Sequence, residues 1–461
     1  MWLAFPAMFH RIPAVVSTRA SVAMSVTMLL VVVTVSGCGD GGSAEPSRAG
    51  LAQVGSPPVD VADLPGRIVV LVDGLGVVVR NPDGSGEVVL DAVDGPSPAQ
   101  QPTWSPDGRR VAWASFDSRT SPAVRIAEPG VEVDPGGSDG PVGQVTVRAL
   151  PTAPFYFDWA PDGSRLAWLG PGRFGVSGGI VDTRAGVAGM PLVLVEGRSV
   201  FVDWLPDSSG LVAHVDGARL ETSVPGSPTT LLHQPTGPFG APEVLPDGRI
   251  VVIGGTEVPE VMSISHGGAH DKAQVRLEIL GAGVGQAMAE SEVVAVIDGS
   301  PARFDVDPTG SRVAVWSVLA SGTRPMVVVD LATGSVVQVL DDGAFGGVWS
   351  PDGSTPAAVR RVDDDRMVWS VWNPADGPSP LDLTPFTPTI EFAAAYLPFF
   401  DQYARAVTPW SPDGRAFVHT RLVGPDSQVV VQPVRPVGGL VVVGEGDVAW
   451  WSPGQEFMPG S

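Results

Sequence analysis

The stretch that decides the fold is Trp104-Ser105-Pro106-Asp107-Gly108, which is followed directly by the run RRVAWAS at 109–115. Proline holds φ near −65° at the first central position of a tight turn, and aspartate tolerates the second. Glycine then accepts the positive φ that follows. The run after the turn alternates as a half-buried strand does. The stretch therefore predicts a tight turn leading into a β-strand.

The same turn recurs along the chain. Eight copies contain Pro106, Pro161, Pro206, Pro246, Pro308, Pro351, Pro412 and Pro453, at spacings of 55, 45, 40, 62, 43, 61 and 41 residues. These spacings are close to the ~40–50 residues of one propeller blade, with insertions in three places. Four copies keep the whole turn motif, namely Trp104, Pro106, Asp107, Gly108; Trp159, Pro161, Asp162, Gly163; Trp349, Pro351, Asp352, Gly353; and Trp410, Pro412, Asp413, Gly414. The copies at Pro246 and Pro308 lack the tryptophan, and the last copy lacks the aspartate.

Each unit continues with two more strand-like runs, for example 325–334 and 335–342. A four-stranded blade is too small to bury both of its faces alone, so blades stack around an axis, with the tryptophan as filler between them. The chain after residue 66 opens with three strand-like runs and ends with a first strand and its turn at 446–454. We therefore predict an all-β fold: one propeller of eight four-stranded blades, with seven as the alternative. A blade shared between the N- and C-terminal strands would remove the open sheet edges.

The iterated unit resembles the TolB-like propeller repeat, whose consensus is close to W-S-P-D-G-x-x-L-A-F, and the resemblance covers nearly all of the chain after residue 66. TolB-like proteins act as interaction platforms in bacterial cell-envelope assemblies. The resemblance thus implies a non-enzymatic scaffold with an envelope protein as its partner, and a monomeric propeller.

The N-terminal segment has the layout of a secretory signal. His10, Arg11 and Arg19 precede the apolar run 21–35, which is shorter than the roughly 20 residues of a membrane span. Val-Ser-Gly-Cys at 35–38 then resembles the lipobox of bacterial lipoproteins, in which the cysteine is acylated and cleavage occurs just before it. We expect a signal peptide at 1–37, a flexible tether at 38–66 that begins with lipidated Cys38, and the propeller at 67–461. The protein would then face the extracytoplasmic side of the cell membrane; an uncleaved signal anchor is the alternative.

The composition excludes one class of partner. Lys+Arg number 28 against 50 Asp+Glu, so the formal net charge is −22, which repels nucleic acid. Cys38 is the only cysteine, so the chain forms no internal disulfide. Lys272 is the only lysine, which suggests a GC-rich genome such as that of an actinobacterium.

Motifs for catalysis or metal binding are weak. The G-x-S-x-G match around Ser177 works only at a strand-to-helix elbow, and no helix signal follows, so a glycine-rich hairpin is favoured. His266, His270 and Asp271 could form a weak metal site, but two intervening glycines favour a hairpin tip. The acidic stretches 132–139 and 363–365 lack the ligand spacing of a calcium loop. We therefore expect no enzymatic activity, no cofactor and no metal.

The insertion at 384–409 is rich in aromatic residues. The candidate partner-binding residues there are Phe386, Phe392, Tyr396, Phe399, Phe400 and Tyr403. Two interpretations remain: aromatic anchors on one rim of the disc, or rings that pack under the rim between two blades. A separate alternative for the function is an enzyme or a ligand or metal binder in the central channel. It would use Asp158, Asp203 and Asp305, which lie just before the turns on inner strands.

Overall fold

The computed structural model describes residues 59–90, 99–115, 121–130, 145–184, 190–234, 240–255, 274–281, 290–298, 302–317, 325–341, 343–373, 379–435 and 437–454. The expected signal peptide, Cys38, the start of the tether, the His266–Asp271 cluster and the stretch 132–139 lie outside these residues. Within them, no helix is long and apolar enough to cross a membrane.

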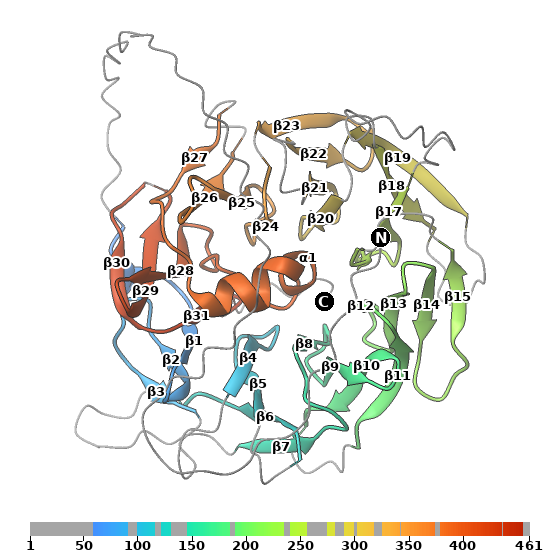
Figure 1. The fold of residues 1–461 in the computed structure, drawn as a ribbon, viewed down its shortest axis with the longest axis horizontal. Coiled ribbons are helices and arrows are strands. Elements are labelled where there is room, and N and C mark those ends of the chain that lie inside the picture. Colours follow the sequence, from blue (N-terminus) through green and yellow to red (C-terminus); the bar gives the residue numbers. More distant parts are fainter. Residues whose placement is uncertain are drawn as a thin grey trace. The chain divides into compact units, whose positions relative to one another are not determined.

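Antiparallel sheets arranged as blades make up the fold (Figure 1). We number the blades from the first that is continuous in sequence. Blade 1 consists of β4 (Ala99–Trp104), β5 (Val111–Ser115), β6 (Ala123–Ala127) and β7 (Thr146–Ala149). Blade 2 consists of β8 (Tyr156–Trp159), β9 (Arg165–Gly172), β10 (Gly175–Asp182) and β11 (Leu192–Gly197). Blade 3 consists of β12 (Val200–Trp204), β13 (Leu211–Val215), β14 (Arg219–Ser223) and β15 (Thr230–His233).

The second half of the chain repeats this pattern. Blade 4 consists of β16 (Glu243–Val244), β17 (Ile250–Gly255), β18 (Gln274–Leu280) and β19 (Ser291–Asp298). Blade 5 consists of β20 (Ala302–Val306), β21 (Arg312–Ser317), β22 (Met326–Asp330) and β23 (Val336–Leu340). Blade 6 consists of β24 (Gly346–Trp349), β25 (Pro356–Arg361), β26 (Met367–Val371) and β27 (Leu381–Asp382). Blade 7 has β28 (Ala416–Val423), β29 (Asp426–Pro433) and β30 (Val441–Glu445), with a single bridge between Trp410 and Phe417 in place of an inner strand.

Blade 8 closes the ring. Its inner strand is the last of the chain, β31 (Val448–Trp451), which pairs antiparallel with β1 (Ile68–Val72) from Ile68↔Trp451 to Leu71↔Val448. Two further strands, β2 (Gly76–Arg80) and β3 (Val88–Val89), complete it. The predictions of an all-β fold, of eight blades and of a shared closing blade are confirmed.

The packed part of the chain begins before the expected domain boundary at residue 67. A short 3-10 turn, η1 (Val61–Asp63), buries Val61, and Leu64 is buried with it in the hydrophobic cluster between blades 7 and 8. The indole Nε1–H of Trp451 donates to the carbonyl of Pro65 at 2.8 Å. The last residues of the expected tether therefore pack against the propeller.

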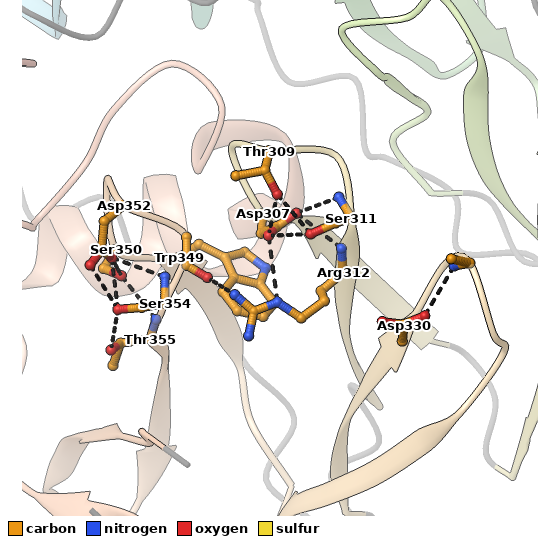
Figure 2. A network of polar contacts seen from close by, with 12 residues as sticks. Asp307, Thr309, Ser311, Arg312, Asp330, Trp349, Ser350, Asp352, Ser354 and Thr355 are labelled. Carbon is orange, nitrogen blue, oxygen red and sulfur yellow. Dashed lines mark hydrogen bonds and ion pairs between the residues drawn. The ribbon is translucent and has the colours of Figure 1, made fainter. Parts of the chain in front are cut away.

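The repeated turns have the predicted backbone. Gly108 and Gly353 have φ of 65° and 67°, and Ser208 takes the same position in blade 3 with φ of 59°. The aspartate of the motif stabilises the turn through its side chain. In blade 6, Asp352 Oδ1 accepts from the Ser350 hydroxyl at 2.6 Å and from the Ser354 backbone N–H at 2.9 Å (Figure 2). This is the local reason why Ser-Pro-Asp-Gly recurs.

The tryptophan of the motif packs between blades, as predicted. Trp349 Nε1–H donates to the Asp305 carbonyl of the preceding blade at 2.9 Å, and Trp204 donates likewise to Asp158 at 3.1 Å. An arginine of the preceding blade stacks on the ring: Arg312 Cζ lies 5.0 Å from the Trp349 ring centroid (Figure 2). Arg110 lies 4.8 Å from Trp159 in the same way and donates to the Gly163 carbonyl at 2.6 Å. Each such arginine therefore links its own blade to the repeated turn of the next blade.

Replacing Arg110 by alanine should lower the free energy of unfolding by about 1–2 kcal/mol, because a cation–π contact and a hydrogen bond between blades are lost. Urea denaturation measures the change. Arg109→Ala is the matched control, since Arg109 is the exposed neighbour, and it should stay within about 0.5 kcal/mol of the unmodified protein. Equal losses in both variants would contradict the role assigned to Arg110.

Candidate functional site

The insertion between β27 and blade 7 lies inside the ring of blades, where Figure 1 shows α1. We call residues 384–409 the plug. It contains a π-helical turn, η4 (Phe392–Tyr396), a 3-10 turn, η5 (Leu397–Phe399), and one turn of α-helix, α1 (Phe400–Tyr403).

The aromatic rings of the plug are mostly core. Five of the six candidate partner-binding residues are buried in the same hydrophobic cluster, namely Phe386, Phe392, Tyr396, Phe400 and Tyr403. For these five, the interpretation as exposed rim anchors is wrong, because the rings pack against blade side chains such as Trp369 of β26 and Trp450 of β31. The packing interpretation holds for them, although they lie inside the ring rather than under its rim. Phe399 is the exception, with 48% of its surface exposed.

Hydrogen bonds hold the plug to the inner strands. The Gln402 amide pairs with both backbone groups of Val202 in β12: Nε2 donates to the carbonyl at 2.8 Å, and Oε1 accepts from the N–H at 3.0 Å. Gln402 also donates to the Tyr156 hydroxyl at 2.8 Å, and the Tyr403 hydroxyl donates to the Phe155 carbonyl at 2.5 Å. The plug therefore satisfies backbone groups on the inner edge of the blades, which a propeller otherwise leaves open.

Four acidic residues line one side of the centre. Asp158, Asp203, Glu243 and Asp305 occupy the same repeat position in blades 2 to 5, directly before the residue that starts the turn motif. Two of them link to the next blade. Asp203 Oδ2 accepts from the Val244 N–H at 2.6 Å, and Glu243 Oε2 accepts from the Val306 N–H at 3.0 Å. We call these four residues the acidic arc.

Arg405 of the plug faces the acidic arc. Its side chain is only 6% exposed; Nη2 lies 3.3 Å from Glu243 Oε2, and Nη1 lies 3.8 Å from Asp203 Oδ2. Burial lowers the pKa of Arg405, but Glu243, Asp203 and Asp305 outweigh it and the pKa is raised overall. A second pair lies beside it, since Arg303 Nε is 3.3 Å from Asp401 Oδ2.

Burial dominates the titration of the arc. It raises the pKa of Asp158 and of Glu243 well above the ordinary range and that of Asp305 to about 7, while Arg405 acts in the opposite direction. The pKa of Asp203 is raised for the same reason. Four buried carboxyl groups thus face one guanidinium, and burial favours their protonated, neutral forms.

Two cavities adjoin Arg405. The larger has a volume of about 380 Å³, with Asp203, Glu243, Asp305 and Arg405 in its wall. The smaller, of about 200 Å³, is lined by Asp158 and Arg405. Prolines of the repeated turns also line the larger one, namely Pro106, Pro308, Pro351, Pro412 and Pro453. The larger cavity therefore lies at the end of the inner strands where the repeated turns are. We call this side of the ring of blades the turn face.

The other sequence candidates are structural where they are described. Ser177 lies within β10 opposite Gly170 of β9, so the G-x-S-x-G match is a glycine-rich hairpin, as predicted. Asp363 pairs with Arg366 at 2.5 Å in an exposed turn. Among the described residues, no group of three His, Cys, Asp or Glu is placed to hold a metal ion.

Sequence reasoning found three members of the acidic arc and missed Glu243 and Arg405. Glu243 precedes a turn without tryptophan, but its position before Val-Leu-Pro-Asp matches that of Asp203 before Trp-Leu-Pro-Asp. Arg405 is the only basic residue of the plug, and a single cation in a mostly apolar insertion was the available signal.

Comparison by sequence finds no matching family and no matching curated protein. Solved structures do match in shape. A eukaryotic initiation factor aligns with a TM-score of 0.52 at 12% identity, covering 84% of this chain and 98% of that one. TolB from Acinetobacter baumannii aligns with a TM-score of 0.36 at 16% identity, over 70% of this chain and 64% of its own. An oligogalacturonate lyase in complex with manganese gives 0.45 at 16%, over 76% and 86%.

The chain is a β-propeller protein. At these identities the likeness shows the fold alone, which binding proteins and enzymes share.

Proposed function

We propose that this propeller is a non-enzymatic binding scaffold, held by a lipid on Cys38 at the extracytoplasmic side of the cell membrane, which binds a cell-envelope protein. The observation that carries the proposal is a pair of exposed apolar side chains, Ile390 and Phe399, which the plug presents on one face. The resemblance of the repeat to that of TolB-like interaction platforms points the same way.

This face lies opposite the turn face, and we call it the loop face. Neighbouring strands in each blade run antiparallel, so the turns between second and third strands and the connections to the next inner strand lie at the same end. The large apolar side chains exposed there are Leu75, Phe155, Phe174, Val362, Ile390, Phe399 and Val423. Two of them, Ile390 and Phe399, come from one segment, the plug, and are the candidate contacts with a partner.

The side chains at the centre of the loop face come from the plug, which hydrogen bonds hold to the blades. Ile390 and Phe399 belong to the plug and are 79% and 48% exposed. The Phe399 ring lies 6.4 Å from that of Phe201, and the residues after it are fixed by Gln402 and Tyr403. Aromatic anchors held by a rigid scaffold bind at a low entropic cost.

Substitution of Ile390 and Phe399 by aspartate should abolish recovery of the envelope partner when the tethered protein is cross-linked in membranes and purified. A charge on each side chain would be buried unpaired in the interface. The matched control carries Val336→Asp and Val337→Asp in β23, whose side chains are similarly exposed but lie on the outer edge of blade 5. Recovery of the same partner with both variants would refute the loop-face proposal.

Cys38→Ser should abolish incorporation of a radioactive fatty acid and shift the protein from the membrane to the soluble fraction. Acyl chains contribute roughly 0.8 kcal/mol per buried methylene, so their loss releases the protein. Growth with labelled palmitate, followed by fractionation, measures both effects. A Cys38→Ser protein that still took up label would overturn the anchor.

A further inference from the structure

We propose that the larger cavity at the turn face binds a small polyhydroxylated primary amine. Its ammonium group would pair with Asp203, Glu243 and Asp305, and a hydroxyl oxygen would accept from Arg405. This inference is independent of the loop-face scaffold, since it concerns the opposite face of the blades.

The geometry supplies a site of suitable size. A cavity of about 380 Å³ is of the size that holds small molecules. Three carboxyl groups from consecutive blades and one guanidinium converge in its wall. The acids project from the inner strands β12, β16 and β20, which are rigid elements, so their spacing is set by the fold.

The excess of acidic groups in the wall of the larger cavity favours a cationic ligand. Three carboxyl groups share one guanidinium, and the nearby Arg303 lies 3.3 Å from Asp401 in the plug. Burial raises the pKa of Asp305 to about 7 although Arg405 lowers it, so this carboxyl group holds a proton more readily than an exposed one. An ammonium group in the cavity would take the place of the protons that the buried acids otherwise hold.

Arg405 requires an acceptor as well. Its Nε and Nη1 have no hydrogen-bond partner among the described residues, although the side chain is only 6% exposed. A buried donor without a partner costs about 1–3 kcal/mol, and an ammonium group cannot relieve that cost. A hydroxyl group can, because its oxygen accepts from the guanidinium while its hydrogen is donated to a carboxylate.

Most of the remaining wall is apolar, although Thr408 and Ser452 also line it. Five turn prolines surround the polar groups, and Trp349 and Trp410 also line the cavity. Such a wall fits the C–H face of a hydroxylated carbon chain. Among simple compounds, an amino-alditol combines all three features: a permanent positive charge near neutral pH, hydroxyl groups and an apolar carbon skeleton.

The test is calorimetric titration of the full chain with glucamine (1-amino-1-deoxysorbitol) and with sorbitol, which differ in one ammonium group. Glucamine should bind at least tenfold more tightly than sorbitol. Equal affinity for the two compounds, or no glucamine binding at levels that saturate a dissociation constant of about 1 mM, would overturn the proposal.

Glu243→Gln provides the matched variant. The Val306 N–H and Arg405 Nη2 both donate to Glu243 Oε2, and the glutamine oxygen can accept both, so the fold is kept while the charge is lost. We expect glucamine affinity to fall at least tenfold, while the exposed control Asp247→Asn should retain it. Unchanged affinity in a folded Glu243→Gln protein would contradict the assigned contact.

Discussion

Deletion of residues 446–461, which removes β31, should leave a chain without cooperative thermal unfolding. β31 is the inner strand of blade 8 and pairs with β1 over four residues, so its loss opens the ring and exposes two sheet edges. Trp450 and Trp451 are buried, at 2% and 1% exposed. Truncating a buried tryptophan costs roughly 3–5 kcal/mol, so losing both approaches the 5–15 kcal/mol by which a domain is stable.

Calorimetry and near-ultraviolet circular dichroism of the purified proteins measure the effect. The matched control is deletion of residues 455–461, which leaves β31 intact and should unfold as the full chain does. If the chain that lacks β31 melted cooperatively at the midpoint of the control, the shared blade would not be what holds the ring closed.

The ring of blades could be predicted from the repeated turn, because each turn is formed by residues that are neighbours in the sequence. Pro106, Asp107 and Gly108 form the turn within a few residues, and each copy does so independently of the others. The closing blade was predictable for a related reason. The first strands of the chain lack an inner partner and the last strand lacks outer ones, so the two sets complete each other.

The position of the plug was not predictable in the same way. An aromatic insertion such as Phe392–Tyr403 has the same composition whether its rings face solvent or the centre of the ring. The position of the plug is decided by contacts between residues far apart in the sequence. Gln402, for example, donates a hydrogen bond to the carbonyl of Val202 in blade 3, which lies 200 residues earlier. The role of Arg405 could not be predicted for the same reason. Its acidic neighbours Asp203, Glu243 and Asp305 come from three blades, and no spacing within the plug indicates them.

Replacing Arg405 by methionine should destabilise the protein by about 3–5 kcal/mol at pH 8, because removing one partner leaves buried carboxylates without compensating charge. The loss should be much smaller at pH 5, where the acidic arc can hold its protons. Urea denaturation at the two pH values measures it. Arg415→Met is the control. Arg415 pairs with Asp413 at 2.6 Å but is 43% exposed, so its loss should cost at most about 1 kcal/mol.

The sign of the pH effect follows from the arc. A carboxyl whose pKa is raised on folding binds more protons in the folded than in the unfolded state, so stability falls as pH rises from the unfolded pKa to the folded one. For Asp305, whose pKa is raised by burial from its ordinary value of 3.8 to about 7, this window runs from about pH 4 to pH 7. Without Arg405, which opposes that rise, the window extends to higher pH. Asp305→Asn should therefore flatten the pH dependence of the unmodified protein and raise its stability at pH 8. An Asp305→Asn protein that kept the full slope between pH 5 and pH 7 would show that Asp305 does not contribute to it.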